Sequence, residues 1–248
     1  MSFERLGIIA LALLLLSACS VKENRSDCPC HLSVSLSGAP LKLRISGEDC
    51  LIEQDIPKDT LLVVLVPKGR ISVAALRGAD YSPDGSVRIP YGYDSPPVFI
   101  DVAEVDTSSE AAEASLCPSK SFCALDIDFD SPPGGGEPYR VDIRGEVDGW
   151  NPDGSLSGGD YSFRFVPDSE GRAQLRLPRQ MDSSLMMDIL FDDKIVRTFA
   201  LGETIAGSGY DWGAESLEDL SLTLKLSLTA FGFSAELWKD EVKLEILI

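Results

Sequence analysis

Apolar residues recur at every second position along most of this chain. Leu32, Val34 and Leu36 alternate with serines, and Leu125 and Ile127 alternate with aspartates. A period of two is typical of β-strands that have one buried and one solvated face. Similar runs predict strands at residues 41–45, 61–66, 71–76, 87–89, 98–102, 139–143, 161–165, 173–177, 187–191, 195–199, 220–228, 231–237 and 242–248.

Two segments depart from this simple alternation. Residues 111–116 are compatible with a loop or a helical turn, and residues 201–205 predict a short helix. The two runs around Asp192-Asp193-Lys194 are close enough to form a hairpin, because aspartate tolerates the backbone geometry of a tight turn. No long amphipathic helix and no repeat of fixed period is evident.

The clearest break in the pattern is Ser131-Pro132-Pro133-Gly134-Gly135-Gly136. Proline and glycine clusters of this kind separate structural units. The strands on either side are short and are separated by turn residues, which is typical of antiparallel β-sandwiches. We therefore expect an all-β chain with an N-terminal β-sandwich domain at 27–131 and a C-terminal one at 137–248.

The first residues predict export and lipidation. The apolar run at residues 6–16 is too short to span a bilayer as a helix, which takes about 20 residues, and its length suits a secretory signal peptide. Leu16-Ser17-Ala18-Cys19 then matches the lipobox of bacterial lipoproteins. We expect a signal peptide at 1–18, lipidation of Cys19 with cleavage before it, and a polar tether at 19–26. Several acyl chains on one cysteine make a durable membrane anchor.

Charge excludes one class of partner. The chain has 40 acidic and 22 basic residues and a formal net charge of −18. Loss of residues 1–18 removes one Glu and one Arg, so this charge is unchanged in the mature chain. Nucleic-acid binding depends on Lys and Arg that neutralise phosphates, so a general nucleic-acid binder is excluded.

After lipidation of Cys19, five cysteines remain, and an oxidising compartment permits some of them to pair. Cys117 and Cys123 are close enough in sequence to close a small disulfide loop, and Cys50 could meet Cys28 or Cys30 across paired strands. The cluster Cys28-Pro29-Cys30-His31 could also be a metal site. Structural zinc usually takes four ligands from paired clusters, so we favour buried structural cysteines and predict no metal.

Catalytic chemistry is not indicated. His31 is the sole histidine and follows the tether directly, whereas a nucleophile needs its histidine base in a pocket built by the fold. Motifs of hydrolases, zinc proteases and P-loop enzymes are missing. We therefore predict no enzyme and no cofactor, although paired carboxylates among so many acids leave acid–base chemistry open.

Two further patterns have a functional and a structural interpretation. Asp126, Asp128, Asp130 and Glu137 have the spacing of a calcium loop, but Ser131 stands where that loop needs glycine, so we favour the polar face of a strand. Trp150, Trp212 and Trp238 could stack on sugars. They lie far apart in the sequence, and core or interface positions are the favoured interpretation.

The mature N-terminus resembles the FimB/Mfa2 family of Bacteroidetes fimbrial lipoproteins. Its members show a lipidated cysteine, a charged tether and a first strand that begins as Arg25-Ser26-Asp27-Cys28-Pro29-Cys30 does here. Shorter similarities follow at Val66-Pro67-Lys68-Gly69-Arg70-Ile71-Ser72-Val73, Leu201-Gly202-Glu203-Thr204-Ile205, Tyr210-Asp211-Trp212, Leu217-Glu218-Asp219-Leu220 and Leu237-Trp238.

This resemblance implies that both sandwiches are transthyretin-like. It also implies an anchor subunit that attaches the base of a fimbrium to the outer membrane, binds pilin subunits and can influence fibre length. Residues 242–248 are a candidate for strand exchange with a pilin, or an ordinary sheet strand, which we favour. A surface-exposed glycan- or ligand-binding lipoprotein is the alternative function.

Overall fold

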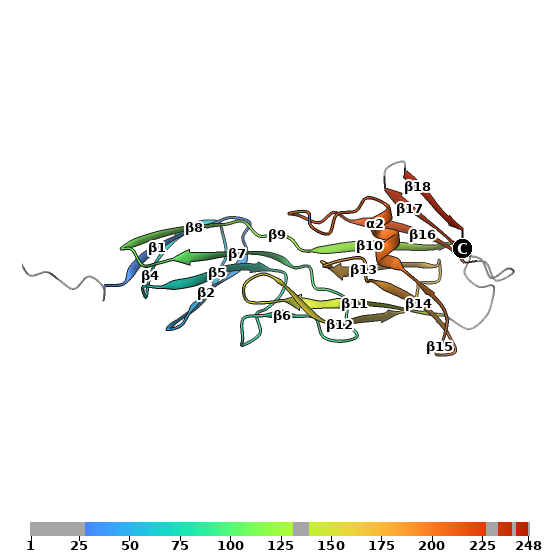
Figure 1. Ribbon diagram of the computed structural model, residues 1–248, viewed down its shortest axis with the longest axis horizontal. Helices are drawn as coiled ribbons and strands as arrows, with labels where there is room; N and C mark the ends of the chain where they lie inside the picture. Colours follow the sequence, from blue (N-terminus) through green and yellow to red (C-terminus); the bar gives the residue numbers. More distant parts are fainter. Residues whose placement is uncertain (1–27, 131–138, 227–232, 240–241, 248) are drawn as a thin grey trace, which may run out of the picture.

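The computed structural model describes residues 28–130, 139–226, 233–239 and 242–247. Figure 1 shows two β-sandwiches that follow one another along the long axis of the molecule. Among the described residues, no helix has the length and apolar character needed to cross a membrane. The predicted all-β fold of two consecutive sandwiches is therefore confirmed.

The N-terminal sandwich has a three-stranded sheet, in the order β4-β1-β8, and a five-stranded sheet, in the order β3-β2-β5-β7-β9. Leu32 and Val34 from the first sheet and Leu43, Ile45 and Val73 from the second are fully or almost fully buried between them. The strands are β1 (Cys30–Leu36), β2 (Leu41–Gly47), β3 (Cys50–Ile56), β4 (Thr60–Val66), β5 (Arg70–Arg77), β7 (Phe99–Asp106), β8 (Ala111–Leu116) and β9 (Ser119–Lys120).

The C-terminal sandwich packs the sheet β13-β10-β16-β17-β18 against the sheet β12-β11-β14-β15, and β6 adds to β11. A separate core, which includes Leu125, Val141, Trp150 and Leu177, lies in this half. Its elements are β6 (Val87–Arg88), β10 (Phe122–Asp130), β11 (Arg140–Trp150), β12 (Leu156–Phe165), β13 (Arg172–Pro178), β14 (Met186–Phe191), β15 (Lys194–Phe199), α2 (Leu201–Gly207), β16 (Leu220–Leu226), β17 (Phe233–Lys239) and β18 (Val242–Leu247).

The two sandwiches share one topology. In the first, β1 lies between its antiparallel partner β4 and its parallel partner β8; in the second, β10 lies between antiparallel β13 and parallel β16. The order β3-β2-β5-β7 of the other sheet corresponds to β12-β11-β14-β15. Seven strands of one sandwich therefore have a counterpart in the other. Among the described residues, the short strand β9 occurs only in the first sandwich, and β6 and the hairpin β17–β18 occur only in the second.

The division between the two cores differs from the predicted boundary. The sequence pattern places β10 in the first domain, yet the strand pairs with β13 and β16, and its Cys123, Leu125 and Ile127 lie in the C-terminal core. The change of core is not at a single point of the chain: Val87, Ile89 and Val98 already lie in the C-terminal core, whereas Val105 and Leu116 lie in the N-terminal one. The Pro- and Gly-rich segment at 131–137 comes after β10 in the sequence. Residues 131–138 themselves lie outside the described residues.

The predicted helix and the predicted hairpin are both present in the structure. Residues 111–116, whose sequence is compatible with a loop or a helical turn, form strand β8, because they pair with β1 along their whole length. The predicted helix at 201–205 is α2, and the predicted hairpin is β14–β15. Asp192 and Asp193 have φ of 51° and 57°, the left-handed pair that a tight hairpin turn requires.

Arg179 ties the sandwich junction together. Its guanidinium donates to the carbonyls of Trp212 at 2.6 Å and Ala214 at 2.7 Å, and at 3.2–3.3 Å to the Lys120 and Glu215 carbonyls and the Ser121 hydroxyl. Burial lowers the pKa of this guanidinium. One side chain thus joins the end of β13, the β9–β10 junction and the loop after α2.

Candidate functional site

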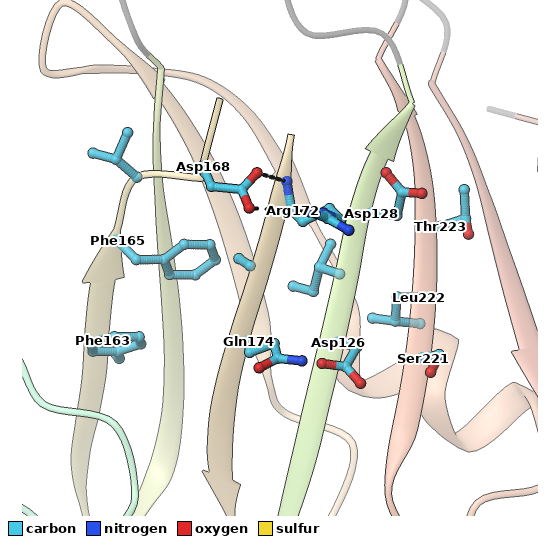
Figure 2. Close-up of a pocket in the computed structure, with 13 residues that line it drawn as sticks. Asp126, Asp128, Phe163, Phe165, Asp168, Arg172, Gln174, Ser221, Leu222 and Thr223 are labelled. Carbon is cyan, nitrogen blue, oxygen red and sulfur yellow. Dashed lines mark hydrogen bonds and ion pairs between the residues drawn. The ribbon is translucent and has the colours of Figure 1, made fainter. Parts of the chain in front are cut away.

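A groove of about 690 Å³ opens at the end of the C-terminal sandwich between β12, β13, β10 and β16. Figure 2 shows Gln174, Asp126 and Ser221 in one row across three strands, with Arg172, Asp128 and Thr223 in the next row. These rows are the polar face that the alternation in β10 predicted, so Asp126 and Asp128 are exposed strand residues. Asp130 and Glu137 of the calcium pattern contribute no described side chain.

Phe163 and Phe165 of β12 give the groove an apolar wall. Their rings stack with centroids 5.6 Å apart and an interplanar angle of 21°. The turn that follows β12 is fixed by Asp168, whose Oδ1 accepts hydrogen bonds from the backbone N–H groups of Glu170 and Arg172 at 2.9 and 2.8 Å. The Arg172 N–H is the main cause of the lowered pKa of Asp168. The groove therefore offers carboxylates, an amide and hydroxyls beside two rings, a set suited to binding a polar ligand.

A second polar cluster lies on the sheet that contains β11 and β14. Asp142 and Asp188 are direct cross-strand neighbours and both are buried. Each has its own partners: Arg164 and Ser162 donate to Asp142 at 2.9 Å, while Arg144 donates to Asp188 at 2.7 Å. Two like charges side by side destabilise a sheet, and these separate ion pairs offset the repulsion.

Burial opposes ionisation of Asp188, but hydrogen bonds from Arg144 and Thr198 outweigh it, so its pKa is lowered. The bonded carboxylates in turn raise the pKa of Arg144 and of Arg164. The Asp188 carboxylate and both guanidiniums are therefore charged at neutral pH. The outer face of this sheet consequently presents two half-exposed guanidinium groups in fixed positions.

Tyr91 and Tyr93 stand beside this cluster with 73% and 65% of their surface exposed. Between them, the Gly92 N–H donates to the Ser162 carbonyl at 2.8 Å and fastens their loop to the edge of β12. Tyr91 is near enough to interact electrostatically with both Arg144 and Arg164. Tyrosine and arginine in one exposed patch are typical of recognition surfaces.

The aromatic residues that the sequence singled out are not part of either surface. Trp150 and Trp212 are only 1% and 8% exposed, and the Trp150 indole N–H donates to the Ser121 hydroxyl at 2.9 Å. Trp238 lies in β17, where its backbone pairs with Ser221, but its side chain is not described. The core interpretation is confirmed for Trp150 and Trp212. Tyr91 and Tyr93 were missed, and their signal was two aromatic residues within a Pro- and Gly-containing turn.

Cys117 and Cys123, which the sequence allows to form a disulfide, are both free thiols in the structure. Cys117 is exposed after β8 and Cys123 is buried in β10, so the two thiols face different environments although they are close in sequence. Cys28, Cys30 and Cys50 are free thiols as well. Among the described residues, no group of three or more His, Cys, Asp or Glu side chains is arranged to hold a metal. Cys19 lies outside the described residues, and its lipidation remains a prediction.

No family model and no curated protein matches this sequence. Solved structures do match its fold. The fimbrial anchor protein Mfa2 from Porphyromonas gingivalis matches with a TM-score of 0.64 at 11% identity, over 88% of this chain and 99% of that one. A candidate adhesin from Bacteroides ovatus matches with a TM-score of 0.62 at 10% identity, over 88% and 95% of the two chains.

A candidate polysaccharide-binding protein from Bacteroides thetaiotaomicron matches with a TM-score of 0.58 at 14% identity, over 86% of this chain and 99% of that one. Identities this low show a shared fold, which does not by itself determine function. The predicted resemblance to Mfa2 is thus confirmed as a structural likeness that extends over both sandwiches.

Proposed function

We propose that this protein is a lipid-anchored fimbrial anchor subunit, which attaches the base of a fimbrium to the outer membrane and influences fibre length. The proposal rests on two features that occur together in this chain. A lipobox that ends at Cys19 precedes a pair of sandwiches that match a fimbrial anchor protein over nearly their whole length. The role needs only a membrane attachment and a surface that holds a fibre subunit, and we propose no enzymatic activity.

The test is a Cys19→Ala substitution in cells that assemble the fimbria. Without the lipid, the protein and its fibres should appear in the culture medium instead of the outer-membrane fraction. Cys28→Ala is the matched control, because Cys28 is an exposed free thiol just after the tether and should leave both in place. Retention of the protein and fibres on Cys19→Ala cells would refute the anchor function.

A surface glycan-binding lipoprotein is the second candidate, and the exposed Tyr91 and Tyr93 beside Arg144 and Arg164 favour it. Aromatic rings and guanidinium groups supply stacking and hydrogen bonds to a sugar. Affinity electrophoresis of the mature chain in host and dietary polysaccharides would detect such binding. Retardation that disappears in Tyr91→Ala/Tyr93→Ala would support this function, and unretarded migration of the wild type in every polysaccharide would argue against it.

A further inference from the structure

Strand β4 is apolar on both of its faces, although it lies at the end of its sheet. Leu62 and Val64 point toward the core, while Leu61, Val63 and Leu65 on the other face are 66%, 56% and 57% exposed. In the order β4-β1-β8, only one side of β4 is paired among the described residues. Strands that are apolar on both faces are normally covered on both.

The equivalent strand of the second sandwich shows how such an edge is usually protected. β13 pairs with β10 as β4 pairs with β1, and the inward residues align Val66 with Leu177 and Val64 with Leu175. The outward positions that hold Leu65, Val63 and Leu61 in β4 then hold Arg176, Gln174 and Arg172 in β13. Charged side chains on an edge prevent pairing with other chains, and β4 has none.

The other edges of the N-terminal sandwich also carry charge. β3 has exposed Glu53 and Asp55, and β8 has exposed Glu113. In contrast, β4 has no charged residue, proline or glycine, and its seven consecutive pairs with β1 contain no bulge. The unprotected edge is thus specific to one strand of one sandwich.

A lipid bilayer, a second copy of the chain and an extended peptide could each cover the apolar face of β4, and the hydrogen-bonding groups of its free edge favour the peptide. Burial in a lipid bilayer would leave the N–H and C=O groups of the free edge without partners, at high energetic cost. A second copy would bring another net charge of −18 to the contact. An extended peptide meets both needs, because it pairs with the edge and continues the apolar stripe with its alternate side chains.

We propose that β4 accepts an extended strand with alternating apolar side chains, donated by a subunit of the fimbria that this protein anchors. This inference rests on the proposed function for the identity of the donor. The strand-accepting property itself follows from the free edge of β4 and from Leu61, Val63 and Leu65.

Two probes separate the surface from its donor. The first is fimbriae sheared from the source strain and immobilised on a biosensor; the second is a synthetic peptide of alternating valine and threonine. Residues 20–248 of the wild type should bind both. Val63→Lys should weaken both interactions at least about tenfold, since a charge would be buried at the centre of the contact. Ser115→Lys, an exposed position on β8 at the opposite edge of the same sheet, should bind as the wild type does.

Val63→Lys changes an exposed side chain and should melt within about 2 °C of the wild type, so lost binding will not reflect unfolding. N-methylation of alternate peptide amides should abolish peptide binding, because the added strand can no longer donate to the β4 edge. Equal binding of fimbriae by the wild type and Val63→Lys would overturn the β4 site and leave the anchor function intact.

Peptide binding that depends on Val63, without any binding of fimbriae, would overturn the anchor function and the fimbrial donor while the strand-accepting edge stands. Binding of neither probe would overturn the surface. A wild-type dimer in sedimentation that Val63→Lys dissociates would show that a second copy covers β4, and would also overturn the proposed donor.

Discussion

Arg179→Ala should destabilise the protein more than removal of an exposed arginine. The wild-type guanidinium makes five hydrogen bonds, and two of them, to Trp212 and Ala214, are 2.6 and 2.7 Å long. A hydrogen bond to a charged group contributes about 1.5–3 kcal/mol. If only the two short hydrogen bonds contribute fully, the upper limit on the unfolding free energy lost in Arg179→Ala is about 3–6 kcal/mol. Since Arg179 is half-buried, water can form some of the hydrogen bonds that the variant loses, and we expect the unfolding free energy to fall by about 3 kcal/mol.

Thermal unfolding followed by circular dichroism measures this loss. For a chain of 248 residues that unfolds in one step, each kcal/mol lowers Tm by about 2–4 °C, so Arg179→Ala should melt roughly 6–12 °C lower. Arg179→Lys should fall between the wild type and Arg179→Ala, because an ammonium group keeps the charge but not the planar set of donors.

Arg172→Ala is the matched control, since Arg172 begins the strand β13 that ends just before Arg179, and its side chain pairs with the exposed carboxylates of Asp168 and Glu170. Pairs of this kind contribute at most about 1 kcal/mol. A Tm of Arg179→Ala no lower than that of Arg172→Ala would refute the view that carbonyl bonding by Arg179 stabilises the junction.

Three further predictions concern single residues. Gly78→Ala should lower the unfolding free energy, measured by urea titration, by about 2 kcal/mol or more, because φ of Gly78 is +86° and a Cβ would lie 1.9 Å from the Pro97 carbonyl oxygen. Gly207→Ala is the control: a Cβ there would meet nothing within 4 Å, so this variant should be neutral or stabilising. The pKa of Asp188 is lowered in the folded state, so the ionised carboxylate stabilises the protein above its unfolded pKa of about 3.9, and this stabilisation is lost as pH falls through the folded pKa. The difference in unfolding free energy between the wild type and Asp188→Asn should therefore shrink below about pH 4. A difference that does not change with pH would contradict the ion pair. Burial raises the pKa of Cys123 to about 11, whereas Cys117 is exposed, so iodoacetamide should modify Cys117 in the native protein and Cys123 only after unfolding. A Cys117–Cys123 disulfide found by mass spectrometry would contradict the structure.

The candidate surfaces show how far sequence reasoning reached. The alternation in β10 correctly predicted that Asp126 and Asp128 lie on one solvated face, because adjacent residues of a strand point to opposite sides. It could not predict that Gln174 and Ser221 flank Asp126, since those residues come from strands about 50 and 95 positions later in the chain.

The sequence by itself determined the class of the fold, the hairpin β14–β15 and the helix α2, because these follow from local period and turn chemistry. The tertiary structure decided that β6 and β10 belong to the C-terminal sandwich, that Trp150 and Trp212 are buried, that Cys117 and Cys123 face different environments, and that one face of β4 is exposed. A period of two states that a strand has two faces. Which strand pairs beside it, and whether an apolar face meets a core or solvent, depend on contacts between distant segments that the local pattern does not encode.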